Sequence, residues 1–292
     1  MIKHAFNSPA ITSLAAALLI SLNASLANSE PQRLISTDAG ATELIFSLGL
    51  EKSLVAVDVT SQLPKDHQPL PNIGYHRNLS AEGLLSLEPT TVIGSEFMGP
   101  PPVVSALQQA RVQLVRLPSA KTSAQLRSNI DELAAALQQN ERGKALIKHL
   151  DQQLSALHDL PLKGQKIAFL LSVDTAKLRL AGTGSSGVAL INLLAGNSVA
   201  EFNNYQTVSA ESLMAMQPDI ILVAGKNIST AVDELLAANP ILLHSPAGLN
   251  QRIIAVNGST LVAGLSVAAV DEALRLAKQL NQQAPYLQAA TH

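Results

Sequence analysis

The sequence has 292 residues, a formal net charge of −2 at pH 7 and no cysteine. The lack of cysteine excludes disulfides, thiolate metal ligands, a catalytic thiol and a lipid-modified N-terminal cysteine. The near-neutral charge differs from that of nucleic-acid-binding proteins, because phosphate recognition requires a clustered basic surface. We therefore expect no nucleic-acid partner.

The first residues have the pattern of a secretory signal. Lys3 and His4 precede an apolar stretch, Ile11–Leu22, which is followed by small residues that end with Ala-Ser-Leu-Ala at Ala27. We therefore expect cleavage near Ala27 and a mature chain of about 265 residues. The apolar stretch is shorter than the roughly 20 residues that a membrane-spanning helix needs, so the sequence predicts an exported, soluble protein of the periplasm.

Short β-branched strands alternate with helices along the chain. Before residue 120, strands are predicted at 33–36, 54–57, 91–94 and 113–117, with helices at 42–48, 81–87 and 103–110. From residue 161 the alternation resumes, with strands predicted at 166–171, 219–223 and 252–256 and a helix at 188–194. This order predicts parallel strands joined by crossover helices, which is an α/β fold.

A segment rich in Ala, Leu, Gln, Glu and Lys separates the two α/β halves. It predicts a short helix followed by a long one from about Glu141 to His158. The mature length also exceeds the usual size of one domain. The predicted organisation is a signal peptide at 1–27, an N-terminal α/β lobe at 28–140, a linking helix at 141–160 and a C-terminal α/β lobe at 161–292.

The two halves contain a repeat. Residues 79–94 read LSAEGLLSLEPTTVIG and residues 208–223 read VSAESLMAMQPDIILV. Each copy places a predicted N-cap Ser two residues before a Glu, Glu82 or Glu211, where the helix dipole favours a carboxylate. Duplicated packing explains the shared Leu, Pro and Ser. It explains the two Glu less well, so they are candidates for contact with a partner, with an ordinary solvated face as the alternative.

The ten residues Gly74–Gly83 read GYHRNLSAEG. They resemble the Gly-Tyr-x-Arg-x-Leu-Ser-x-Glu-Gly segment of haem carriers in the helical-backbone class of ABC-transporter binding proteins, which also includes cobalamin and ferric-siderophore carriers. Supporting matches are Gly40–Glu43, Val57–Ser61, Gly94–Pro101 and Ala181–Gly184. The resemblance covers essentially the whole mature chain. It implies two Rossmann-like lobes joined by a single long α-helix, a ligand cleft between the lobes, and haem b as the transported ligand.

The resemblance implies that Tyr75 is the axial ligand of ferric haem. Ferric iron favours a hard anionic oxygen, which a tyrosinate supplies, and the guanidinium of Arg77 would stabilise the phenolate. In an extended segment, Tyr75 and Arg77 face the cleft together while His76 faces away. A partly buried structural tyrosine and an ordinary surface arginine are the alternatives. The remaining histidines considered, His149, His158 and His244, are expected on the surface, which favours ligation by tyrosine alone.

Other contacts with haem are expected from residues in four loops. Lys226, Thr183 and Ser185 are candidates for binding the propionates, with a solvated lysine and a polar turn as the alternatives. Phe97, with Met98 beside it, follows a strand and is a candidate for packing on the macrocycle, with loop packing as the alternative. Tyr205 precedes its repeat copy almost as Tyr75 precedes the first, which predicts a place on the opposite lip of the cleft or a structural role.

The predicted function is periplasmic binding of haem and its delivery to an inner-membrane ABC transporter for haem and iron uptake. The resemblance implies that Glu82 and Glu211 each dock on one subunit of the permease dimer. We also expect an outer-membrane haem receptor upstream, and a monomeric carrier.

Two alternatives differ in ligand or in class. A siderophore or cobalamin carrier of the same class is the closer alternative. The distant one is a two-lobed Rossmann-type enzyme, which would need a phosphate-binding glycine loop near the first strand, where this chain has Ser36–Thr42. The sequence also lacks a nucleophile elbow and paired metal-ligating histidines, so we expect no enzymatic activity and no catalytic residue.

Overall fold

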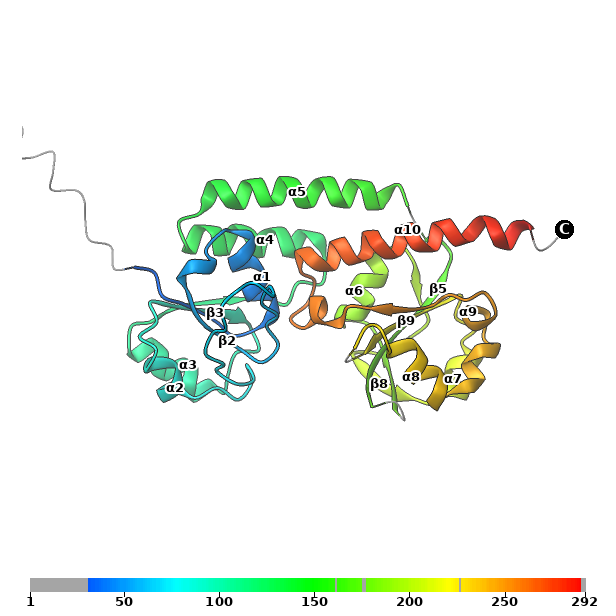
Figure 1. Cartoon of the computed structure of the whole chain (residues 1–292), viewed down its shortest axis with the longest axis horizontal. Coiled ribbons are helices and arrows are strands. Elements are labelled where there is room, and N and C mark those ends of the chain that lie inside the picture. Colours follow the sequence, from blue (N-terminus) through cyan, green and yellow to red (C-terminus); the bar gives the residue numbers. More distant parts are fainter. Residues whose placement is uncertain (1–30, 161, 175–176, 226, 290–292) are drawn as a thin grey trace, which may run out of the picture. The chain divides into compact units, whose positions relative to one another are not determined.

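The computed structural model describes residues 31–160, 162–174, 177–225 and 227–289 (Figure 1). The predicted signal peptide, residues 1–27, and Lys226 lie outside the described residues. Within the described ranges, no helix has the length and apolar character needed to cross a membrane.

The first lobe is built on a four-stranded parallel sheet in the order β2-β1-β3-β4. Its strands are β1 (Leu34–Ser36), β2 (Leu54–Val57), β3 (Thr91–Ser95) and β4 (Gln113–Leu117). Its helices are α1 (Ala39–Ser47), α2 (Ala81–Leu85), α3 (Pro101–Gln109) and α4 (Ser123–Ala136), with the 3-10 turn η1 (Glu51–Ser53) before β2. Successive strand residues face opposite layers, since Leu34 packs with α1 and α4 whereas Ile35 packs with α2 and α3.

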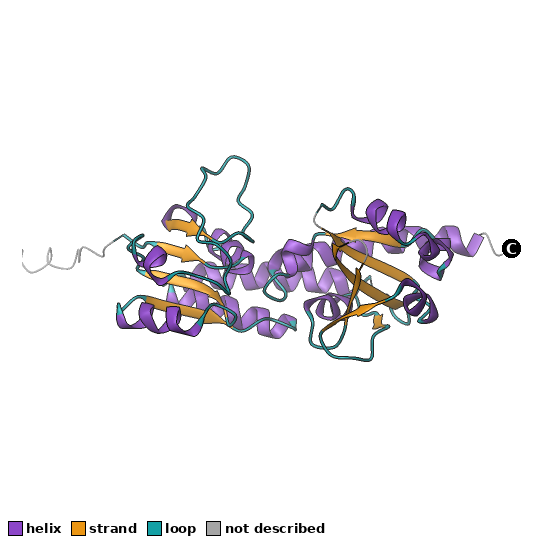
Figure 2. Cartoon of the chain, turned by 90° about the horizontal axis from the view of Figure 1, so that it is seen from below, coloured by secondary structure: helices purple, strands orange, loops and turns teal. Residues whose placement is uncertain are grey.

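The second lobe is built on a six-stranded mixed sheet in the order β10-β9-β5-β6-β8, with β7 also paired to β5 (Figure 2). Its strands are β5 (Lys166–Asp174), β6 (Lys177–Ala181), β7 (Asn197–Ser198), β8 (Tyr205–Val208), β9 (Ile220–Gly225) and β10 (Ile253–Val256). Its helical elements are α6 (Ser186–Leu193), α7 (Ala210–Ala215), α8 (Ala231–Ala238), η2 (Pro240–His244), α9 (Pro246–Leu249) and η3 (Gly258–Leu261).

The mixed pairing of the second sheet differs from the all-parallel prediction. Strands β5, β9 and β10 are parallel, but β6 runs antiparallel to both of its neighbours, β5 and β8. The reason is the short connection between β5 and β6, which has too few residues for the crossover that parallel pairing requires. The α/β class predicted from the sequence is confirmed.

Helix α5 (Asn140–His158) follows the first lobe and begins one residue before the predicted start. It packs against α4 and against the C-terminal helix α10 (Val267–Ala289), and the green and red helices run side by side in Figure 1. Gly143 permits the close approach to α4, because a Cβ atom at this position would lie 2.5 Å from the Cβ of Ala134.

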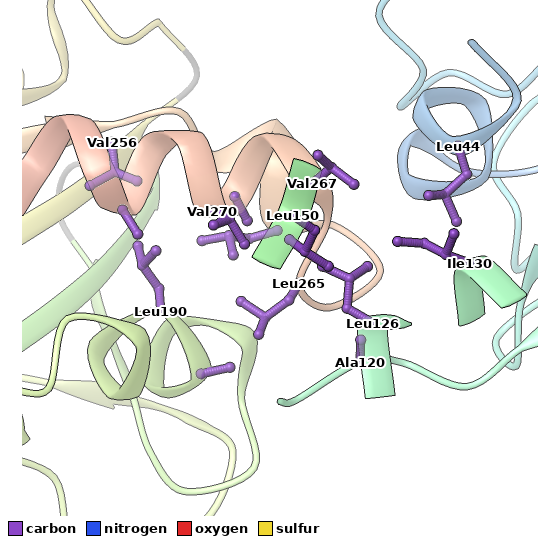
Figure 3. Close-up of a cluster of buried hydrophobic side chains, with 14 of the residues drawn as sticks. Leu44, Ala120, Leu126, Ile130, Leu150, Leu190, Val256, Leu265, Val267 and Val270 are labelled. Carbon is purple, nitrogen blue, oxygen red and sulfur yellow. The ribbon is translucent and has the colours of Figure 1, made fainter. Parts of the chain in front are cut away.

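One hydrophobic cluster extends through both lobes. It includes Leu44 and Ile130 in the first lobe, Leu150 on α5, Val270 on α10 and Leu190 in the second lobe (Figure 3). Each sheet has a second, separate cluster on its other face. The layers that carry α1, α4, α5, α6 and α10 therefore share one continuous core.

The C-terminal part of the chain returns to the first lobe before α10 begins. Gly264 forms an isolated bridge with Ala120, and the backbone amide of Ala268 donates to Oε1 of Glu43 at 2.6 Å. Ser266 and the backbone of Val267 also hydrogen-bond to this carboxylate. Burial raises the pKa of Glu43 above its ordinary value. A side chain of α1 thus satisfies amides at the start of α10, where the helix dipole favours an acceptor.

Replacing Glu43 tests how much its contact with the start of α10 contributes to the free energy of unfolding. Glu43→Ala removes the acceptor, and we expect the free energy of unfolding to fall by about 1–2 kcal/mol in urea denaturation. Glu43→Gln keeps an acceptor oxygen without a titrating group. Because the raised pKa makes the folded state bind the proton more readily than the unfolded chain, the wild type should lose stability relative to Glu43→Gln as pH rises from the unfolded pKa to the folded one. A difference independent of pH would contradict this.

Candidate functional site

Several exposed apolar side chains lie in segments that follow the carboxyl ends of the parallel strands. Val59, which follows β2, is 56% exposed; Ile228, which follows β9, is 47% exposed; and Val262, beyond β10 and η3, is 38% exposed. Tyr75, 46% exposed, lies beside the first of these, because the amide of Val59 donates to the carbonyl of Gly74. Ligands of open α/β sheets bind at this edge, so we place the candidate site here.

The segment that carries Tyr75 is a turn. The amide of Asn78 donates to the carbonyl of Tyr75 at 2.8 Å, so residues 75–78 are not the extended segment that the sequence suggested. His76 is nevertheless buried, and whether Tyr75 and Arg77 face one ligand stays a prediction. Tyr75 and Arg77 are exposed, whereas His76 is 3% exposed and points into the lobe.

His76 is held from below by Asp58. Its Nδ1 lies 3.4 Å from Oδ2 of this buried carboxylate, and its ring centroid lies 4.2 Å from that of Tyr75. Tyr75 remains exposed despite this contact. His76 therefore supports the ring of Tyr75 from inside the lobe, and its burial does not suit direct ligation of a haem in the cleft.

Asp58 also fixes the loop that follows β2. Its Oδ1 accepts hydrogen bonds from the backbone amides of Thr60 and Ser61, both at 3.0 Å, and from both hydroxyls at 2.8–2.9 Å. A buried carboxylate needs this many donors because losing its hydration is costly. The same group thus positions Val59 and Tyr75.

Arg77 and Phe97 contact each other. The guanidinium carbon of Arg77 lies 4.3 Å from the centroid of the half-buried Phe97 ring, a cation–π geometry. Among the described residues, no hydrogen bond joins Arg77 to the hydroxyl of Tyr75. Met98 differs from the expectation that it faces a ligand, because it is 3% exposed and packs in the core beneath the first sheet.

Three other candidate residues of the second lobe do not lie at the carboxyl edge of its sheet. They are Tyr205, Thr183 and Ser185. Tyr205 pairs with Ala181 at one end of the β6–β8 ladder, whereas the opposite end of β5 pairs Ser172 with Gly225 at the carboxyl edge. Tyr205 is the first residue of β8, which runs in the same direction as β5 and β9, so it lies several residues away from the carboxyl edge where Ile228 lies. Contact of Tyr205 with a ligand stays a prediction.

Both Tyr205 and Ser185 are used by α6. The hydroxyl of Tyr205 accepts from the amide of Gly187 at 3.2 Å, and its ring is half-buried. The hydroxyl of Ser185 is buried, donates to the carbonyl of Gly182 and accepts from the amide of Val188. Ser185 is therefore occupied as a helix cap, while Thr183 is exposed.

The two Glu residues of the repeat occupy equivalent places. Ser80 and Ser209 cap α2 and α7 by accepting from the amide three residues on, and Glu82 and Glu211 are both exposed in the first turn. The equivalence continues to the end of each helix, where Glu88 and Gln217 have φ values of 48° and 51° before a proline. Donation from its own amide and from Ser209 holds the pKa of Glu211 below its ordinary value.

Two asparagines that the sequence analysis passed over lie at the carboxyl edge of the second sheet. Asn227 follows β9 and Asn257 follows β10, and both line a pocket of ≈ 590 Å³ that Gln62 of the first lobe also lines. A sequence signal existed, because each strand is followed by Asn-x-Ser. The histidines expected on the surface, His149, His158 and His244, are exposed.

Replacing Asp58 tests whether it stabilises the loop after β2 and the turn that carries Tyr75. Asp58→Ala leaves the donors of Thr60, Ser61 and His76 without an acceptor, and we expect a loss of about 2–4 kcal/mol in the free energy of unfolding, measured by urea denaturation. Asp58→Asn retains one acceptor oxygen and should cost less. A loss below about 0.5 kcal/mol for the alanine variant, typical of a neutral surface change, would show that the loop does not depend on Asp58.

Comparison with known proteins gives a consistent class. A family model described as periplasmic binding protein matches residues 34–259. The solved structure of the periplasmic haem-binding protein HutB of Vibrio cholerae is 37% identical, with a TM-score of 0.78 over 85% of this chain and 98% of that chain. The haem-binding protein RhuT from Roseiflexus is 31% identical, with a TM-score of 0.78 over 87% and 99%. A curated relative, the vitamin B12-binding protein of Vibrio campbellii, is 23% identical over 70% of this chain and 75% of its own length.

Proposed function

We propose that this chain, which belongs to the periplasmic binding protein family, binds ferric haem through Tyr75 and delivers it to an inner-membrane ABC importer for haem and iron uptake. The observation that carries the proposal is the placement of Tyr75. Its ring is exposed at the carboxyl edge of the first sheet, beside an exposed valine, and is backed by a buried histidine. The likeness to solved haem-binding proteins supports haem as the ligand.

The surroundings of Tyr75 fit a flat, apolar ligand with a hard metal at its centre. The phenolate of tyrosine suits ferric iron, and coordination favours loss of the phenolic proton, which otherwise has a pKa near 10. Val59, Phe97 and Ile228 supply apolar surface for the macrocycle. Arg77 is exposed and contacts the ring of Phe97, and we propose that its guanidinium turns toward the phenolate when haem binds.

The transported form is proposed to be haem b. The chain has no cysteine, so covalent attachment through thioether bonds is excluded. Lys226 and Thr183 remain propionate candidates from the sequence. Tyr205 and Ser185 are not included in the proposed site, since their hydroxyls serve α6.

The tyrosine assignment is tested by hemin titration of the purified mature chain. Tyr75→Phe keeps the ring and removes the ligand oxygen, so the high-spin ferric spectrum typical of tyrosinate ligation should disappear. We expect the affinity to fall about 100-fold, which corresponds to about 2.8 kcal/mol. Tyr205→Phe is the matched control and should keep the wild-type spectrum. An unchanged spectrum in Tyr75→Phe would exclude ligation by Tyr75.

Export and lobe boundaries form part of the same proposal. A signal peptide at residues 1–27 would direct the chain to the periplasm, where members of this family act. The proposed lobes, 28–140 and 161–292, are linked by a helix at 141–160. A monomeric carrier without catalytic activity fits this family, and an outer-membrane haem receptor would supply its ligand.

Glu82 and Glu211 are proposed to dock on the two permease subunits. They are exposed, occupy equivalent positions in the repeat and lie on different lobes, as contact with a two-fold symmetric partner requires. Exposed charges at such a surface chiefly steer the encounter and set its register.

Docking can be separated from haem binding by mutation. Glu82→Ala combined with Glu211→Ala should leave hemin affinity within about twofold of wild type and reduce uptake of haem iron by about tenfold, because each lost charge weakens the encounter. Uptake is measured as growth on hemin as the sole iron source. Glu88→Ala is the control, since Glu88 is exposed at the other end of α2. Normal growth of the double variant would contradict the docking assignment.

Cobalamin is the alternative ligand, favoured by the names of the curated relatives. A carrier for cobalamin or for a ferric siderophore does not require Tyr75. Binding of cyanocobalamin with no spectral response to hemin would therefore replace haem as the ligand while leaving the family and the transport role unchanged.

A further inference from the structure

The pocket at the carboxyl edge of the second sheet is rich in hydrogen-bonding groups. Asn227, Asn257 and Ser259 line it from the second lobe, and Gln62 lines it from the loop that Asp58 organises. None of the described residues that line this pocket is acidic or basic. It therefore presents neutral polar groups beside the proposed haem site.

The two asparagines use their side-chain oxygens within their own turns. Oδ1 of Asn227 accepts from the amide and hydroxyl of Ser229 at 3.0 and 2.9 Å. Oδ1 of Asn257 accepts from the amide and hydroxyl of Ser259 at 3.3 and 2.7 Å. A backbone N–H only donates, so the oxygen of each carboxamide must face its own turn. In the described part of the chain neither NH₂ group donates to another residue.

The two donors leave neighbouring strands on the same edge. Val256 pairs with Ala224 in the parallel β9–β10 ladder, so Asn257 and Asn227 follow the two strands within a few residues of the same level. Neighbouring strands lie about 4.8 Å apart. Two NH₂ groups carried by neighbouring strands and lining one pocket can serve two carboxylates carried on one edge of a ligand.

The carboxylates near the pocket are engaged elsewhere. Glu272 accepts from the backbone amide of Asn257 and is paired with Arg275. Glu43 lines the adjoining pocket together with Asn257, but its carboxylate is turned to the start of α10 and accepts from the amide of Ala268. Burial also raises the pKa of Glu43, which disfavours its charged form. A carboxylate in the pocket would instead gain hydrogen bonds from neutral donors, which are stronger when the acceptor is charged.

We infer that Asn227 and Asn257 form the subsite for the two propionate carboxylates of haem, with Gln62 closing the subsite from the first lobe. The inference rests on the proposed function, because Tyr75 would bind the iron of the haem whose propionates occupy this pocket. Ser185 was the earlier candidate for a propionate donor, but its hydroxyl already donates to the carbonyl of Gly182. Asn227 and Asn257 take its place in the proposed subsite.

The test compares hemin with hemin dimethyl ester, in which both propionates are esterified. Asn227→Asp and Asn257→Asp keep the oxygen that accepts from each serine but replace the donor with a negative charge. Asn72→Asp is the matched control, because Oδ1 of Asn72 accepts from the amide of Gly74 in the same kind of turn while Asn72 lines a different pocket. Binding is measured by absorption titration in one detergent-containing buffer, and folding by urea denaturation.

We expect each aspartate variant to lose about tenfold in affinity for hemin, about 1.4 kcal/mol, and less than about threefold for the ester. Asn72→Asp should behave as wild type with both ligands. Equal losses for hemin and ester, or no loss for hemin, would overturn the subsite while leaving the haem function intact. Wild-type protein that binds cyanocobalamin and neither porphyrin would overturn the haem function, and the propionate subsite with it.

Discussion

Asp58 is buried where β2 ends, and an ionised carboxylate in that position is tolerated only with full hydrogen-bond compensation. The compensation comes from two directions: the hydroxyls and amides of Thr60 and Ser61 in the following loop, and the ring of His76 from the turn beside it. One side chain thereby ties the loop to the turn. Val59 and Tyr75 are exposed on the outer side of this loop and turn. The shape of the candidate site therefore depends on Asp58, a buried group that no ligand would touch.

The two lobes are held by more than the linking helix. The shared hydrophobic core runs from α1 through α5 to α10, and the carboxylate of Glu43 meets the first amides of α10. Any movement that separated α1 from α10 would expose apolar side chains and leave those amides without their acceptor, both of which cost free energy. The contacts at Gly264 and Ala268 show that the C-terminal segment belongs in part to the first lobe, although its strands and helices belong to the second.

Strand positions were predictable because short buried runs such as Ile220–Val223 are apolar throughout, and the repeat was predictable because its caps require Ser at fixed spacing. The pairing of Tyr205 was not, because the sequence did not reveal β6, the antiparallel strand with which β8 pairs. His76 is buried, but residues 75–78 form a turn, so its contact with Asp58 and not strand alternation accounts for its direction. Asn227 and Asn257 were missed because an asparagine after a strand is ordinarily interpreted as a turn residue. Here its oxygen serves the turn, and its NH₂ group is the proposed donor to the ligand.

Neutral amides allow easier release of the propionates of a carried ligand than a lysine would. A carrier must bind its cargo and then release it to the transporter, so interactions that are individually modest and numerous are easier to exchange than one buried ion pair, whose breaking leaves an uncompensated charge. The specific bond to the metal can then lie with Tyr75, on the opposite lobe from the amides. With the metal ligand on one lobe and the carboxylate donors on the other, separation of the lobes would weaken both sets of contacts at once, because haem could not span them.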